Sequence, residues 1–121
     1  MEIVYHGPEN SKTAEIIAEG VIINDTQDMI DIMADCRYNG AGSIIIHKEN
    51  LIPGFFDLKT RIAGDILQKF SNYRMQLAII GDFTELKSKS LRDFIFESNK
   101  TGMINFVPGL DEALQAFSDN R

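Results

Sequence analysis

Cysteine is scarce, tryptophan is absent and no apolar run is long, and these shortages exclude several classes of protein. Cys36 is the one cysteine among 121 residues, which excludes an intrachain disulfide and a cysteine-rich zinc site. A lone cysteine fits a reducing compartment, so we expect a cytoplasmic protein. The longest apolar runs, 44–46 and 77–80, are far shorter than the roughly 20 residues that cross a membrane. We therefore expect no targeting signal and no membrane partner.

Positive charge is also in short supply. Twelve Lys and Arg against 18 Asp and Glu give a formal net charge of −6. Because affinity for nucleic acids comes from cationic groups that displace counterions, we expect no nucleic-acid partner. The length is that of one domain, so residues 1–121 are expected to form a single unit with a core of its own.

Apolar residues recur with two different spacings along the chain. Two short β-prone segments come first, at 3–5 and 15–23. Continuous apolar runs predict strands covered on both faces, as in parallel sheets: 43–47, 75–80 and 103–107. A period of 3.6 predicts four helices: 26–39, 56–73, 90–100 and one from 110 onward. The fold class is therefore α/β, a single small domain with a mostly parallel central sheet covered by about four helices.

Several helix ends carry recognisable signals. The segment Asn24-Asp25-Thr26 offers an N-cap before the first helix, and Asp28 complements the helix dipole. Ser90, with Asp93 three residues later, predicts a start for the third helix that is similar to a capping box. Gly64 costs about 1 kcal/mol relative to Ala inside the long helix. A close approach of that helix to the sheet would explain it.

Several blocks of sequence resemble a known family. They are FFDLKT at 55–60, AGDILQKF at 63–70, IGDF at 80–83, SKSLRDFI at 88–95 and ESN at 97–99. These blocks resemble the bacterial domain of unknown function 4180 family over nearly the whole chain. The resemblance implies a bacterial protein and carries no activity with it.

The element order and the segment 106–117 are similar, more distantly, to SpoIIAA-like and STAS domains. Those small α/β modules bind proteins, nucleotides or lipids, often as regulators. Many of them carry a phosphorylatable serine directly after an aspartate, at the start of the helix that follows the third strand. Asp57 matches that aspartate, but Leu58 stands in place of the serine. The resemblance thus implies a regulatory module without that switch, unless Thr60 substitutes in a different helix register.

Polar residues gather where the predicted strands end. Ligands of open α/β sheets bind beyond the carboxyl ends of the strands, and the start of the long helix is expected at the same edge. The ligand-binding candidates there are His47, Asp57, Lys59, Thr60 and Asp82. An acid–base pair could be drawn from them, so a small ligand-binding domain or enzyme using the Asp57, Lys59 and Asp82 rim is the alternative function. Caps and solvated loop charges explain the same residues without a function.

The start of the third helix is a second candidate site. Lys87, Lys89 and Arg92 lie there with Ser88 and Ser90, and backbone N–H groups at a helix start can hold an anion. A polar connection with a serine cap explains the same residues more simply.

No motif for catalysis or metal binding is present. The chain has no Ser-His-Asp order, HExxH, CxxC, P-loop or GxGxxG. His6 and His47 lack a third ligand, so no metal and no cofactor are expected. This absence favours a protein that is not an enzyme.

The third helix carries an aromatic residue on its outer side. Leu91, Phe94, Ile95 and Ser98 share one face, and Phe96 lies about 140° from Leu91 at 100° per residue. Such a ring is either covered by the 83–90 loop or part of an interface, together with Arg92 one turn earlier. We favour an interface, whose commonest closed form is a two-fold homodimer. The leading function is therefore a regulatory or protein-interaction module that binds an unknown protein.

Overall fold

A computed structural model describes residues 1–119. The strands are β1 (Glu2–His6), β2 (Lys12–Ile17), β3 (Ala41–His47), β4 (Gln76–Ile80) and β5 (Ile104–Val107). The helices are α1 (Thr26–Tyr38), α2 (Ile62–Asn72), α3 (Lys89–Thr101) and α4 (Leu110–Asp119). This element order confirms the predicted α/β class.

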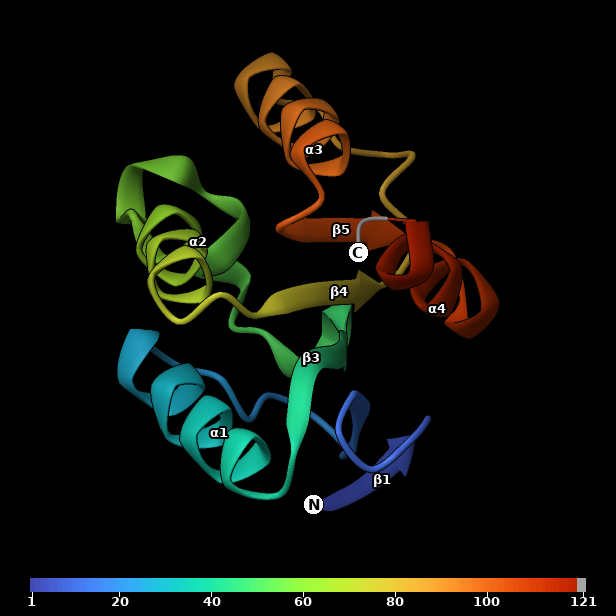
Figure 1. Ribbon diagram of the computed structural model, residues 1–121. Helices are drawn as coiled ribbons and strands as arrows, with labels where there is room; N and C mark the ends of the chain where they lie inside the picture. The colour runs from blue at the N-terminus through green and yellow to red at the C-terminus, as the bar shows by residue number, and fades with distance from the viewer. Residues whose placement is uncertain (120–121) are drawn as a thin grey trace.

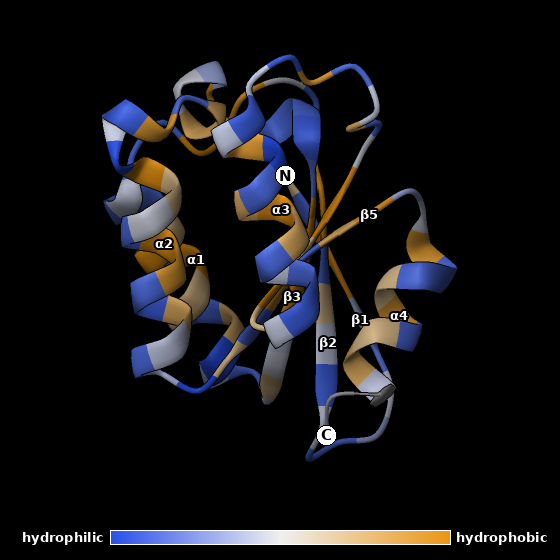
Figure 2. Ribbon diagram, turned by 90° about the horizontal axis from the view of Figure 1, so that it is seen from above, coloured by the Kyte–Doolittle hydropathy of each residue, from blue (hydrophilic) through white to orange (hydrophobic). Residues whose placement is uncertain are grey.

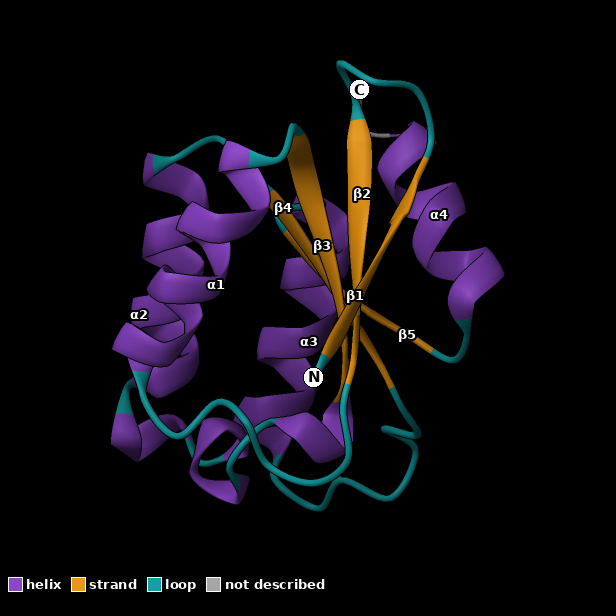
Figure 3. Cartoon of the chain, turned by 90° about the horizontal axis from the view of Figure 1, so that it is seen from below, coloured by secondary structure: helices purple, strands orange, loops and turns teal. Residues whose placement is uncertain are grey.

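The five strands form one sheet in the order β1-β2-β3-β4-β5 (Figure 1). β1 is antiparallel to β2, and the other neighbouring strands are parallel. Right-handed crossovers between strands that follow one another place all their helices on the same face. Figure 2 shows α1, α2 and α3 on one side of the sheet and α4 on the other, and Figure 3 shows the same layers from below.

The core lies on both faces of the sheet. Ile44 and Ile46 belong to the larger cluster, which α1, α2 and α3 cover. Ile45, between them, belongs to a second cluster with Phe117 of α4. Because successive side chains of a strand point to opposite faces, a run of isoleucines without alternation is what a strand covered on both faces requires.

The predicted long helix is wrong at its start. Residues 53–56 and 58–60 form short 3-10 turns, and α2 begins only at Ile62. The Asp57 carboxylate accepts a hydrogen bond from Lys59 N, and the Thr60 hydroxyl donates to Gly54 O and Asp57 O. These local hydrogen bonds compete with the helix ladder, and residue 61 then takes the left-handed conformation.

The predicted strand region 15–23 is also wrong in its second half. β2 ends at Ile17, and Ile23 forms only an isolated bridge with Leu51. The backbone N–H groups of Ile22 and Ile23 both donate to Asn50 O, which binds this segment to the end of β3 instead. Residues 18–22 therefore form a loop at the carboxyl edge of the sheet.

The helix caps agree with prediction at α1 and differ at α3. Asp25 caps α1 and accepts from Asp28 N at 2.9 Å. α3 is capped by Ser88, two residues before the predicted Ser90, because the Ser88 hydroxyl accepts from the N–H three residues later. A Cβ at Gly64 would meet nothing within 4 Å, so the expected close approach to the sheet is wrong. None of the helices within residues 1–119 is long and apolar enough to span a membrane.

Candidate functional site

A groove of about 680 Å³ lies at the carboxyl ends of β3 and β4. Its volume falls within the range of small-molecule sites, about 300–1,000 Å³. Most of its wall is apolar: Val21, Leu51, Pro53, Phe56, Ile80 and Leu86. The polar residues at its edge are His47, Lys48 and Glu49. The carboxyl edge predicted from the strand ends thus holds a groove, with apolar walls from segments far apart in the sequence.

Lys48 joins two of the loops that line this groove, those that follow β3 and β4. Its Nζ donates to Asp82 O at 2.8 Å and lies 5.7 Å from the Phe56 ring centroid and 5.4 Å from that of Phe83. An ammonium group over aromatic rings gains a cation–π attraction. A Cβ on Gly81 would lie 2.7 Å from Lys48 Cβ, so glycine at this position is what allows the contact.

A row of phenylalanine rings connects the groove with α3. Phe56 and Phe83 have centroids 6.1 Å apart, Phe83 and Phe106 meet edge to face at 5.2 Å, and Phe94 of α3 lies 6.2 Å from Phe106. Such pairs each stabilise by about 0.5–1.5 kcal/mol beyond their burial. No periodicity in the sequence indicated this row, because its members come from two loops, a strand and a helix.

Asn50, which sequence reasoning missed, fixes the lip of the groove. Its side chain is fully buried. The amide donates to Ala18 O at 2.9 Å and Gly20 O at 3.0 Å, and Oδ1 accepts from His47 N at 3.1 Å. These bonds hold the 18–22 loop, and therefore Val21, against the end of β3. A single asparagine in a loop carries no sequence signal for this role.

His47 and Asp82 lie at the predicted edge. His47 lines the groove, and Asp82 lines an adjoining depression together with Phe83 and Thr84. The Asp82 carboxylate accepts from Thr84 Oγ1 at 2.6 Å and from Thr84 N at 2.9 Å. These hydrogen bonds, with a smaller contribution from the Lys48 charge, lower the pKa of Asp82. A carboxyl group used as a general acid needs the opposite shift.

The other rim candidates lie apart from Asp82. The side chains of Asp57 and Thr60 are engaged in the 3-10 turns before α2, whereas Lys59 contributes only its backbone N–H there. No hydrogen bond or ion pair within residues 1–119 joins these three residues to Asp82. They are also absent from the walls of the groove. In the same range, no three His, Cys, Asp or Glu side chains come close enough to hold a metal ion.

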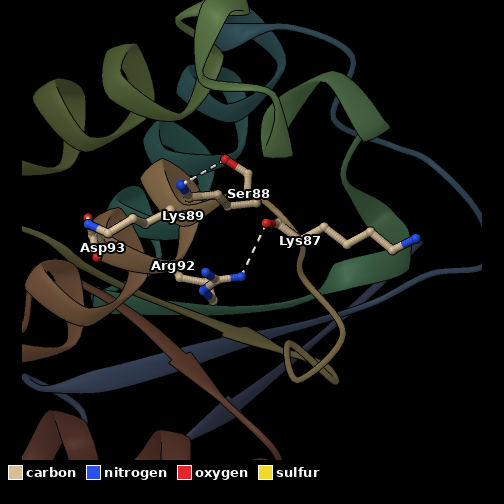
Figure 4. Close-up of polar contacts among 6 residues, drawn as sticks. Lys87, Ser88, Lys89, Arg92 and Asp93 are labelled. Carbon is tan, nitrogen blue, oxygen red and sulfur yellow. Dashed lines mark hydrogen bonds and ion pairs between the residues drawn. The ribbon is translucent and has the colours of Figure 1, made fainter.

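The cations at the start of α3 are largely engaged (Figure 4). Arg92 Nη1 donates to Leu86 O at 3.0 Å and Lys87 O at 3.2 Å, and Lys89 Nζ pairs with Asp93 at 3.0 Å. The Lys87 side chain extends away from Arg92 in Figure 4. Arg92 thus closes the loop that precedes α3, which accounts for its presence without a bound anion.

Phe96 lies on the outer side of α3, as the helix geometry predicts. Its side chain is 67% exposed, so the 83–90 loop does not cover it. Leu91 and Ser98 are buried on the opposite side. Within residues 1–119, only two large hydrophobic side chains are more exposed than Phe96: Tyr38 at 91% and Met1 at 70%.

These features define a small α/β domain with a mostly parallel five-stranded sheet, an apolar groove at its carboxyl edge and an uncovered aromatic ring on α3. The chain belongs to the family described as Domain of unknown function (DUF4180), whose model matches residues 8–117. No curated protein and no solved structure gave a significant match.

Proposed function

We propose that this chain is a regulatory or protein-interaction module of the bacterial cytoplasm, with a STAS-like architecture and no catalytic activity of its own. The observation that carries the proposal is Phe96, whose ring is 67% exposed on the outer side of α3. The element order, similar to that of STAS regulators, supports it. The buried free thiol of Cys36 supports a reducing compartment.

The exposed ring offers a partner a useful amount of binding free energy. Full burial of a phenylalanine side chain stabilises by about 1.5–3 kcal/mol. With two-thirds of the ring available, a partner that covers it gains about 1–2 kcal/mol, or roughly 5- to 30-fold in Kd. Arg92, one turn earlier on the same helix, is exposed and adds a polar contact at the rim of the surface.

The test compares Phe96→Glu with Tyr38→Glu, a control at an exposed aromatic residue on α1. Proteins retained from a native lysate are identified by mass spectrometry, and the retained protein is then purified and titrated against each variant. We expect Phe96→Glu to weaken binding by at least about fivefold and Tyr38→Glu to leave it unchanged. If the wild type, Phe96→Glu and Tyr38→Glu bind the partner equally well, the proposal is wrong.

The groove supports a second candidate, the binding of a small ligand. Its volume of about 680 Å³ and its mostly apolar wall favour a ligand with a substantial apolar part. A thermal-shift screen against nucleotides, phosphates, acyl lipids and metals tests this. A ligand at 100 times its Kd stabilises by about 2.7 kcal/mol.

A matched pair of variants locates any hit. Val21 at the lip is 44% exposed and Ile17, outside the groove, is 42% exposed. Val21→Glu should abolish the ligand-induced shift, and Ile17→Glu should preserve it. If both variants keep the ligand-induced shift in Tm, the ligand binds outside the groove.

A further inference from the structure

We propose that two copies of this chain pair antiparallel along β1, around a two-fold axis at Val4, and so join their sheets into one. This surface goes beyond the interface proposed above, because β1 and β5 are opposite ends of the sheet and α3 packs on β5. A dimer built this way leaves both Phe96 rings uncovered. The argument rests on the difference between the two sheet edges and on the sequence of β1.

The β5 edge is closed by a side chain. Asn99 Oδ1 accepts from Phe106 N at 2.6 Å, and Asn99 Nδ2 donates to Phe106 O at 3.2 Å. The side-chain amide of Asn99 on α3 thus occupies the outward-facing N–H and C=O of Phe106, which another strand would need for continuous pairing along β5. Natural sheets protect their edges in this way because an open edge strand pairs readily with another chain.

The β1 edge has no such protection within residues 1–119. The segment Glu2–His6 contains no proline and no lysine, and its register with β2 runs without a bulge. Only β2 pairs with it, so one side of the strand keeps backbone donors and acceptors that no other strand uses. Its Ile, Val and Tyr residues are among those with the highest β-propensity.

The sequence of β1 is complementary to itself in one register. With Val4 opposite Val4 of the second copy, Glu2 faces His6 and Ile3 faces Tyr5, each pair occurring twice. Aromatic pairs with β-branched residues, such as Tyr5 with Ile3, are favourable cross-strand partners. A shift of two residues in either direction leaves Glu2 or His6 without a partner from the strand. The Val4-centred register is therefore the one that pairs every residue of β1.

The two faces of β1 suit this junction. Ile3 and Tyr5 are partly buried and pack against the main core, so their contact with the second copy extends that core across the axis. Val4 lies on the opposite face of the strand, as do Glu2 and His6. His6 Nε2 contacts Glu15 Oε1 of β2 at 2.8 Å on this opposite face, which fixes the orientation of the His6 ring.

The dimer is expected to be weak. A five-residue strand pair buries less than the roughly 1,000 Å² typical of stable interfaces. Each copy also carries a net charge of −6, and this repulsion is screened at 0.15 M ionic strength. Sedimentation velocity at that ionic strength, over tens to hundreds of micromolar protein, should therefore show a reversible monomer–dimer equilibrium.

Charge variants at Val4 test the position of the axis. Val4→Lys alone and Val4→Glu alone should be monomeric, because like charges meet at the axis, whereas a 1:1 mixture should recover the dimer. Circular dichroism confirms that each variant is folded. A wild-type monomer throughout the concentration range, or folded Val4→Lys that dimerises like wild type, would overturn the proposal.

Disulfide trapping tests the register. Val4→Cys should cross-link with itself under mild oxidation, whereas Ile3→Cys and Tyr5→Cys should cross-link only when mixed. Cys36 gives no background, because it is fully buried and burial raises its thiol pKa to about 11. If Ile3→Cys cross-links with itself and Val4→Cys does not, the proposed register is wrong. Phe96→Glu should still dimerise, which separates this proposal from the partner surface on α3.

Discussion

Replacing Asn50 with alanine tests how the groove is held open. The change removes two hydrogen bonds from the amide to Ala18 O and Gly20 O, and one from His47 N to Oδ1. The Asn50 side chain itself is fully buried, whereas the freed groups belong to Ala18 and His47, which are half-buried, and to Gly20, which is exposed. The loss of each bond therefore costs its net contribution to folding, rather than the larger penalty of a fully buried, unpaired group.

The magnitude follows from these contacts. Each intramolecular hydrogen bond contributes about 1 kcal/mol net, so the three lost bonds amount to about 3 kcal/mol of unfolding free energy. The shift in Tm per kcal/mol of unfolding free energy decreases with chain length. For a domain of this size, 1 kcal/mol corresponds to about 3–5 °C in Tm. We therefore expect Tm to fall by about 9–15 °C.

Urea unfolding and thermal scans of Asn50→Ala provide the measurement. Asn72→Ala is the control, because Asn72 is exposed on α2 and makes one side-chain hydrogen bond with Gln68. We expect the control to change the unfolding free energy by less than about 0.5 kcal/mol. A loss below about 1 kcal/mol in Asn50→Ala would show that this asparagine does not fix the loop.

Three further predictions follow from single contacts. Ser88→Ala should lower the unfolding free energy by about 1 kcal/mol, and Ser90→Ala should leave urea unfolding unchanged, because only Ser88 caps α3. Since hydrogen bonds lower the pKa of Asp82, the stabilisation by its carboxylate is present at neutral pH and is lost on acidification below about pH 4. Asp82→Asn should therefore lower the Tm at pH 7 slightly and show a smaller loss of stability on acidification. The Cys36 thiol, with its pKa raised to about 11 by burial, should react with a thiol-specific dye at pH 8 only after unfolding; rapid labelling of the native protein would contradict this.

The elements whose conformation depends on the local sequence pattern were predictable. The three isoleucines of β3 indicate burial on both faces, and helix geometry places Phe96 on the outer side of α3. The start of α2 was not predictable from periodicity, because the hydroxyl of Thr60 and the carboxylate of Asp57 bind backbone groups that a helix would use.

The candidate site was predictable only in part. Strand ends locate His47 and Asp82 at one edge, since the carboxyl ends of parallel strands meet there. The apolar walls of the groove depend on contacts between distant loops, such as Lys48 with Asp82 and Asn50 with Ala18. Such contacts leave no pattern in a single sequence, so the groove emerges only once the chain is folded.

The order of the strands in the sheet has a consequence for how the chain folds during synthesis. Each new strand adds beside the one before it, and no later strand inserts between two earlier ones. A nascent chain can therefore extend its sheet in the order in which the ribosome delivers it, without first breaking a pairing already made. Growth ends at β5, where the amide of Asn99 occupies the last edge, while the first strand made remains open.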